Sequence, residues 1–401
     1  MIRKLLYRIL APRHPWRRVD FSELSEMYLT GFLRTFAIGM VGIFLPIYLH
    51  KLGYSLTAIL GYYVIFYAVG LLADYIVAHL IAYSGPKHVM RVSFLLQALF
   101  ALVAVNIQNI PFGLPILAVI GCFASTAYFI PYNVDFSKVK HREHGGKEVG
   151  IWQLLEKCAG IIGPLAGGAL ATYVMPSATF IAAGVAMLIA AIVLMLSPEP
   201  VQTRQKLRFK GLKPARHWHA YAAFAFFCGE NMISIIIWPI FLSFVVFKSN
   251  VFLNLGFVTS ISVLVAALVT MPLGRLLDNQ KGRAMITYGT AVNACVHLLR
   301  LLVTNVAGCL FVAVLNEPNT MVYRLAFIKG YYDEADDYPG YRIAFLTFNE
   351  ICADLVRLSV FVILMILSLH LSAYFVCSVA FVLAALFSFL IRLERFAALK
   401  A

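Results

Sequence analysis

The sequence predicts an all-α polytopic membrane protein, with twelve transmembrane helices arranged as two parallel six-helix repeats. Three observations support this fold class: an apolar composition, long uncharged segments, and a repeat between the two halves of the chain. Hydrophobic residues make up 61% of the 401 residues and charged residues 13%, whereas soluble domains contain roughly 45–50% and 25%. This composition excludes an ordinary soluble enzyme.

Long uncharged segments identify the individual spans. Ile161 to Ala190 contains no charged residue, and about 20 consecutive apolar residues suffice to cross a bilayer as a helix. Turn residues and charge clusters divide the chain into twelve apolar segments, at 26–50, 56–81, 90–109, 111–135, 149–173, 176–197, 219–247, 251–276, 284–304, 306–328, 341–368 and 371–391. The longest polar interruption follows the sixth segment, so it separates six spans from six.

The polar segments define the domain organisation. In the basic N-terminal tail, Ile2, Leu5, Leu6 and Ile9 share one helical side, as in a helix that lies on a membrane surface. We expect this tail at 1–20, an N-terminal six-helix bundle at 21–197, a central loop at 198–217, a C-terminal six-helix bundle at 218–392 and a C-terminal tail at 393–401.

The distribution of positive charge predicts the orientation. Of the 33 Lys and Arg residues, 26 lie in the tails and loops on one side of the predicted spans, and short loops rich in Lys and Arg stay cytoplasmic. We therefore expect a multi-pass protein of the plasma (cell inner) membrane with both termini cytoplasmic. The net charge of +14 then reflects topology, and we expect no nucleic acid partner.

Cysteine usage gives no sign of a disulfide framework or a metal site. All seven cysteines fall within apolar segments, and no two form a CxxC pair, the spacing typical of zinc and redox sites. The sequence also lacks the GxxxxGK[ST] motif of nucleotide hydrolysis. We expect no cofactor and no metal, and an energy source other than ATP hydrolysis by this chain.

A repeat at an offset near 194 residues relates the two halves. Three pairs of segments correspond in order: Pro46 to Leu49 with Pro239 to Leu242, Leu60 to Tyr62 with Leu255 to Phe257, and Glu156 to Ala159 with Glu350 to Ala353. Six spans return the chain to its starting side, so the two halves share one orientation. Parallel repeats of this kind place a substrate site between the halves, near the middle of the bilayer.

Two local motifs add to this pattern. The loop after span 8 contains Gly274, Asp278, Lys281, Gly282 and Arg283, which suit either a specific cytoplasmic loop motif or a plain topology-determining loop. The equivalent loop after span 2 keeps only Gly85 and Lys87, with Ala82 at the position of the aspartate. Span 5 carries a face of small residues around a proline, suited to close helix packing: Gly160, Gly163, Pro164, Gly167 and Gly168.

With its twelve spans, basic central loop, parallel repeats and these motifs, the chain resembles the major facilitator superfamily of transporters. The loop after span 8 resembles the GxxxDxxGxR/K motif of that family, with one extra residue before the second glycine, and span 5 resembles the GPxxGG core of many of its exporters. The resemblance implies a central cavity lined by spans 1, 4, 7 and 10.

Span 11 carries the most informative charged residues. Glu350, Asp354 and Arg357 are spaced i, i+4 and i+7, which places them on one helical face. Charged residues within a bilayer face the protein interior or a wet cavity, so this cluster is either a proton relay or gate, or a static ion-pair network. Glu156 is expected to face inward by its correspondence with Glu350.

Arg34 lies near the cytoplasmic end of span 1, and Asp74 and Asp135 near the same end of spans 2 and 4. Pairing of these aspartates with Arg34 would stabilise one gate state, whereas an Arg34 side chain that extends to the membrane surface would have no such role.

Polar residues in the middle of spans 4, 7 and 10 are candidates for the substrate site. In span 10 a proline is expected to bend the helix among amide, hydroxyl and carboxylate groups, and the carboxylates of spans 7 and 10 are expected to meet near the midplane. Two central carboxylates suit a cationic or proton-exchanged substrate. The candidates are Tyr132, Asn133, Glu230, Asn231, Asn316, Glu317, Asn319 and Thr320.

The function predicted from the sequence is secondary active transport of a small solute by alternating access, coupled to protons and in the export direction by antiport. The expected partners are membrane lipids, the small-molecule substrate and protons, and the protein is expected to act as a monomer. Three alternatives stay open: a lipid flippase or scramblase, an uptake symporter or facilitator, and a receptor or scaffold without transport.

Overall fold

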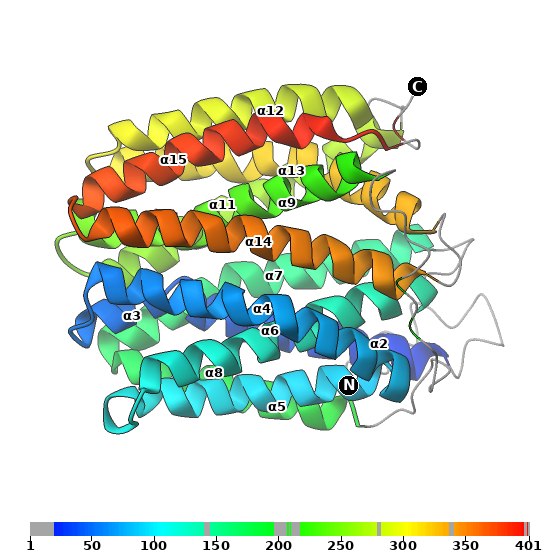
Figure 1. Ribbon diagram of the computed structural model, residues 1–401, viewed down its shortest axis with the longest axis horizontal. Helices are drawn as coiled ribbons and strands as arrows, with labels where there is room; N and C mark the ends of the chain where they lie inside the picture. The colour runs from blue at the N-terminus through cyan, green and yellow to red at the C-terminus, as the bar shows by residue number, and fades with distance from the viewer. Residues whose placement is uncertain are drawn as a thin grey trace.

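The structure is a bundle of long helices running side by side (Figure 1). This computed structural model describes residues 20–139, 145–195, 207, 209, 217–278, 282–336, 341–396 and 399. Those residues contain no β-strand. A helix satisfies its backbone hydrogen bonds within one segment, which is why apolar segments of this length fold as helices in a bilayer.

Helices α2 to α8 come from the first half of the chain. They are α2 (Asp20–Val41), α3 (Leu45–Lys51), α4 (Leu56–Ser84), α5 (Pro86–Val105), α6 (Gly113–Val139), α7 (Gly145–Tyr173) and α8 (Pro176–Val193). Helices α2 and α3 together form the first predicted span. Side chains are not described at 20–25, 27, 133–139 and 145–153, so the side chains of Asn133 and Asp135 lie outside the described part of the structure.

Helices α9 to α15 come from the second half. They are α9 (Trp218–Met232), α10 (Trp238–Phe241), α11 (Val251–Asp278), α12 (Gly282–Leu299), α13 (Val306–Asp336), α14 (Arg342–Ser368) and α15 (Ala373–Leu390). Two π-helical segments, Ile233–Ile237 and Leu242–Val246, flank α10. The side chains of 270–278 and all of Lys281 lie outside the described part.

Eleven segments of the described chain are long and apolar enough to cross a membrane. They match eleven of the twelve predicted spans. The twelfth, predicted at 306–328, is present as α13 but is more polar than the others, because Asn316, Glu317, Asn319 and Arg324 lie within it. Helix α13 packs against both α11 and α12, so it belongs to the same bundle.

The helices of each half pack mainly with one another. Two seams join the halves: α4 lies against α14, and α7 lies against α11, and Figure 1 shows α4 and α14 side by side in the middle of the bundle. Helix α2 begins and α15 ends at the same end of the bundle (Figure 1); we refer to it as the terminal end. This arrangement follows from an even number of crossings.

The glycine-rich face of α7 is where other backbones approach most closely. A Cβ added to Gly163 would lie 2.6 Å from Phe36 O of α2, and a Cβ added to Gly168 would lie 2.6 Å from Phe252 O of α11. A Cβ on Gly160 would be 3.5 Å from Val263 Cγ1, an ordinary contact. Helix α7 therefore packs tightly against α2 of its own half at Gly163 and against α11 of the other half at Gly168.

Both halves interrupt their first span near a repeated proline. Pro46 lies at the start of α3, after the turn that ends α2, and Pro239 lies at the start of α10, after a π-helical segment. A bend was predicted at Pro318, and α13 continues through that residue as one helix. In the second half, the π-helical segments lie in the seventh span and not in the tenth.

Candidate functional site

Three groups of ionisable side chains lie inside the described part of the bundle. The first, which we call the Glu230 network, lies within the second half. The second, the central charges, consists of Arg34, Glu156, Lys157, Glu317 and Arg324. The third, the seam cluster, lies between α4 and α14 and is formed by Asp74, Glu350, Asp354 and Arg357.

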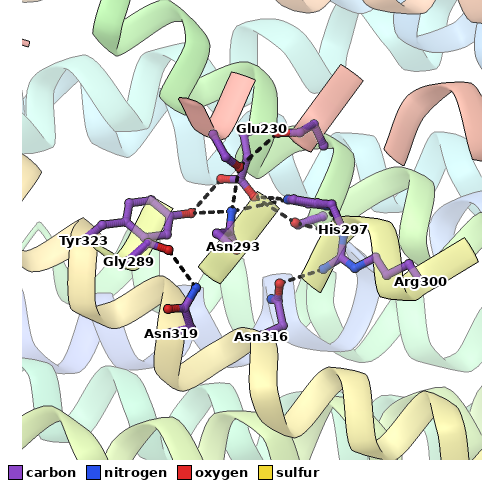
Figure 2. Close-up of polar contacts among 11 residues, drawn as sticks. Glu230, Gly289, Asn293, His297, Arg300, Asn316, Asn319 and Tyr323 are labelled. Atoms are coloured by element: carbon purple, nitrogen blue, oxygen red, sulfur yellow. Dashed lines mark hydrogen bonds and ion pairs between the residues drawn. The ribbon is translucent and has the colours of Figure 1, made fainter. Parts of the chain in front are cut away.

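The Glu230 network links α9, α12 and α13 (Figure 2). The Glu230 carboxylate of α9 is 2.8 Å from His297 Nε2 of α12 and accepts a hydrogen bond of 2.8 Å from the Tyr323 hydroxyl of α13. Ser234, in the π-helical segment after α9, donates to the same carboxylate at 3.2 Å. Glu230 and His297 are 1% and 0% exposed, so a soluble ligand has no access to them.

Arg300 determines the protonation of His297. Its Nη1 lies 3.1 Å from His297 Nδ1, and because a guanidinium has no acceptor atom, Nδ1 must accept this hydrogen bond. The ring proton then sits on Nε2 and is donated to Glu230. His297 is therefore neutral, and it connects one carboxylate to one guanidinium whose charges balance.

Arg300 also connects the network to α13. Its Nη2 donates to Asn316 Oδ1 at 2.9 Å, and its guanidinium lies 5.0 Å from the centroid of the Trp238 ring. One turn further along α13, Asn319 donates to Gly289 O of α12 at 3.0 Å (Figure 2). Asn316 and Asn319 thus tie helices of the second half together.

Two of the central charges lie on α7, and two on α13. Lys157 Nζ lies 3.6 Å from Met321 Sδ, a contact between the halves, and Lys157 also interacts electrostatically with Glu156, Glu317 and Arg324. Lys157 and Glu317 are half-buried, and Arg324 is exposed. Glu317 makes no direct hydrogen bond or ion pair within the described residues, so its carboxylate is free to bind another group.

Arg34 of α2 completes the central charges on the side of the first half. Its guanidinium carbon lies 3.6 Å from the centroid of the Tyr128 ring, and Tyr128 stacks on Tyr132 with 5.4 Å between ring centroids. Arg34 interacts electrostatically with Glu156, and its buried Nε has no hydrogen-bond partner. Arg34 is thus held over an aromatic surface with donor capacity to spare.

The seam cluster brings carboxylates of both halves together. Arg357 donates to Asp354 Oδ1 at 2.6 Å and to Glu350 Oε2 at 3.4 Å. The other oxygen of Asp354 rests against Gly70 of α4, where an added Cβ would overlap it. Asp74 lies one helical turn from Gly70; it is 3% exposed, and its Oδ2 is buried without a hydrogen-bond partner.

The structure groups the predicted site residues differently from the sequence analysis. Glu230 and Glu317 were expected to meet, but Glu230 is bonded within the second half, and each carboxylate interacts instead with Arg300. Pairing of Arg34 with Asp74 was one of two alternatives for Arg34; in the structure Arg34 lies over Tyr128 and interacts electrostatically with Glu156, whereas Asp74 interacts with Asp354.

Neighbouring residues on one helix point about 100° apart, which explains two further placements. Asn316 and Glu317 are adjacent, yet Asn316 faces Arg300 in the second half and Glu317 faces Lys157 between the halves. Thr320, on the same helix, interacts with Tyr323, and Asn231 is half-buried beside Glu230.

Among the predicted loop-motif residues, the structure describes both backbone and side chain of Arg283 and Lys87, and it describes Gly85. Arg283 Nε lies 3.5 Å from Glu394 Oε1, and Lys87 Nζ lies 3.9 Å from Glu26 Oε2. Gly85 has a positive φ of 91° in the turn between α4 and α5, a conformation that favours glycine. Gly282 begins α12. Gly274 lies in α11, whereas the side chain of Asp278 and the whole of Lys281 lie in the part that the structure does not describe.

Three features of these groups were not predicted from the sequence. Two of them are the positions of His297 and Arg300 in the Glu230 network. The offset of three residues between them is a helix-neighbour spacing, which was the available signal. Gly70, four residues before Asp74, carried a similar signal for close approach at the seam.

The comparisons with known proteins agree on a family. The family model described as Major Facilitator Superfamily matches residues 27–331. Among solved structures, a crystal structure of a mutant of the nucleoside transporter NupG is similar, with a TM-score of 0.69 and 11% identity, covering 92% of this chain and 98% of that chain. No curated protein matches the chain.

At this identity the likeness to NupG concerns the fold alone, and it extends over both halves of the bundle. The family model covers more than half of the chain, including the helices that carry Arg34, Asp74, Lys157, Glu230 and Glu317. The protein therefore belongs to the major facilitator superfamily, and it is a multi-pass membrane transporter and not an enzyme.

Proposed function

We propose that the protein is a proton-coupled secondary active transporter that moves a small polar solute by alternating access. The observation that carries this proposal is the set of central charges. Charged groups of the two halves face one another there while half-buried or exposed, and the insertion of an ionised side chain at the bilayer centre costs about 2.5–3.5 kcal/mol. Such a cost is offset when these groups bind a solute between the halves.

The central charges also indicate the kind of solute. From the first half come Arg34, whose buried Nε has no hydrogen-bond partner, and Lys157, whose Nζ lies against Met321 Sδ. From the second half comes Glu317, whose carboxylate makes no direct hydrogen bond or ion pair within the described residues. A solute that carries both an acceptor or anionic group and a donor or cationic group would satisfy both halves at once. The stacked Tyr128 and Tyr132 rings beside Arg34 offer a surface for a planar part of the solute.

We further propose antiport as the mode and export as the direction, with both termini cytoplasmic in the cell inner membrane. The excess of Lys and Arg in alternate loops and in the tails of the sequence supports this orientation, and the tight glycine face of α7 supports the likeness to exporters.

The proposal is tested by flux into proteoliposomes under an imposed pH gradient, with radiolabelled nucleosides, amino acids and organic cations as the panel. We expect at least one solute to accumulate against its gradient when a pH gradient is present and to stop when it is dissipated. Lys157→Met and Glu317→Gln are expected to abolish that flux, whereas His370→Gln, at an exposed loop position, should leave it unchanged.

Lipid handling is the outcome that would replace this proposal. Exchange of fluorescent lipids between leaflets, without gradient-driven solute accumulation by any member of the panel, would contradict solute transport. Solute flux that only equilibrates, and does not respond to the pH gradient, would contradict proton coupling and leave a facilitator.

A further inference from the structure

The seam cluster contains more negative than positive charge. Asp74, Glu350 and Asp354 contribute three carboxylates, and of the described residues only Arg357 brings a positive charge to them. If all three carboxylates were ionised, two negative charges would be uncompensated inside the bundle. The effective penalty for a buried, unpaired ion is several kcal/mol, so the cluster favours binding a proton.

The other titratable or polar groups that face the two aspartates do not supply the missing charge. They come from α4, α6 and α9 and are neutral in their ordinary states: Tyr67 of α4, Cys122 and Thr126 of α6, and Cys228 of α9. The Tyr67 ring lies 5.6 Å from the Arg357 guanidinium carbon. None of these groups can neutralise a second carboxylate.

The geometry distinguishes the two aspartates. Asp354 accepts a short hydrogen bond from Arg357, at 2.6 Å, which stabilises its ionised form. Among the described residues no cation lies within hydrogen-bonding distance of Asp74, and its Oδ2 is buried without a hydrogen-bond partner. A carboxylic acid at Asp74 could donate its proton across the seam to Asp354, whose second oxygen rests on Gly70 one turn away.

We propose that Asp74 binds the coupling proton and holds it against the ionised Asp354 across the seam between the two halves. The proton is retained while α4 and α14 are packed together, and it is released when they separate at this level and water reaches the pair. The proton site is then distinct from the central charges that bind the solute, and this inference rests on the function proposed above.

The rest of the seam shows how such a release could be controlled. From the end opposite the terminal end, α4 and α14 are joined by Thr57 Oγ1 and Ser368 Oγ at 2.9 Å, and by Tyr63 and Phe361, whose ring centroids are 4.8 Å apart. Asp74 and Asp354 lie further along the same line of contacts, nearer the terminal end. If the seam opened from the terminal end, it would expose the carboxylate pair before it separated the Thr57–Ser368 and Tyr63–Phe361 contacts.

Infrared spectroscopy of the protein in lipid nanodiscs tests the site directly, because a protonated carboxyl has a carbonyl band that a carboxylate lacks. At neutral pH we expect such a band in the wild type, its complete loss in Asp74→Asn, and its retention in Glu230→Gln. Asparagine has the shape of the protonated acid, so Asp74→Asn should fold; Asp74→Glu is the second variant, with the band kept and shifted.

Transport provides the second readout. In the same proteoliposomes, Asp74→Asn should lose accumulation driven by the pH gradient while it retains exchange of solute for solute. A carboxyl band that survives in Asp74→Asn, or full pH-driven accumulation by this variant, would overturn the proposal. If the wild type shows the band and loses it in Asp74→Asn but transports nothing, the proton site stands and the proposed function fails.

Discussion

The Glu230 network and the seam cluster are both built from buried charged side chains, but their charges add up differently. In the network one carboxylate and one guanidinium are connected through a neutral histidine, and all three residues lie within one half of the protein. In the seam cluster three carboxylates share one guanidinium, and they come from both halves.

This difference separates a structural role from a functional one. A balanced network inside one half stays assembled while the halves move, so it stabilises the packing of α9, α12 and α13. An unbalanced cluster between the halves changes its surroundings whenever the seam opens, so its free energy depends on conformation. Burial alone does not distinguish the two, because Glu230 and Asp74 are 1% and 3% exposed.

The largest effect on stability is expected from the network. Glu230→Leu leaves Arg300 as a buried charge without its partner, and breaking a buried pair in this way costs about 3–5 kcal/mol. We expect a marked loss of folded protein and a lower melting temperature, measured by fluorescence-detected size exclusion after heating. Glu317→Gln is the matched control, because that half-buried carboxylate has no direct partner to lose; a similar loss there would contradict the distinction.

A substitution in the seam cluster is expected to affect transport more than stability. Asp354→Asn removes a carboxylate but leaves Arg357 with Glu350, so the local charge improves and the loss of stability should be smaller than in Glu230→Leu. Proton-driven accumulation should nevertheless be lost, because the acceptor for the Asp74 proton is gone. The two readouts are the melting temperature and uptake under a pH gradient; unfolding of this variant would argue for a static ion-pair network.

Gly70→Ala tests the close approach at the seam without removing a charge. The new methyl would overlap Asp354 Oδ2, and overpacking of this kind costs about 1–3 kcal/mol. Gly61→Ala on the same helix is the control, since its Cβ would lie 3.6 Å from Met365 Sδ, an ordinary contact. We expect a lower melting temperature and weaker pH-driven uptake in Gly70→Ala but not in Gly61→Ala. If the two variants behave alike, the close approach of Gly70 to Asp354 has no part in proton coupling.

The smallest effect is expected at the far end of the same seam. Thr57→Val removes the hydrogen bond with Ser368, which should cost about 0.5–1.5 kcal/mol and leave proton coupling intact. Thermal unfolding and pH-driven uptake again measure the two quantities. Loss of coupling here would show that the whole seam, and not its carboxylates, determines proton coupling.

Much of the fold could be predicted because the bilayer imposes it locally. All twelve spans were predicted as apolar segments bounded by turn residues and charge clusters; eleven are long and apolar enough to cross a membrane in the described structure, and the twelfth is α13. Pro46 and Pro239, which correspond in the predicted repeat, lie where the first span of each half is interrupted, although the interruptions themselves were not predicted. The π-helical segments beside Pro239 could not be predicted, because they depend on packing around that span.

The candidate site was predictable only where its residues share one helix. Spacing along α14 placed Glu350, Asp354 and Arg357 on one face, as the structure has them. The contacts of Glu230 with His297 and of Asp354 with Gly70 join different helices, and nothing in the local pattern specifies which helices will be neighbours. Depth in the membrane therefore made Glu317 the predicted partner of Glu230, and Asp74 one candidate partner of Arg34.

The most direct test of the distinction between network and seam is pH-driven solute accumulation per folded molecule, measured side by side for Asp74→Asn and Glu230→Gln. Our account expects Asp74→Asn to accumulate no more than protein-free liposomes, and Glu230→Gln to accumulate close to the wild-type level in the fraction that folds. Normal accumulation by Asp74→Asn together with its loss in folded Glu230→Gln would contradict the account and move the coupling proton to the Glu230 network.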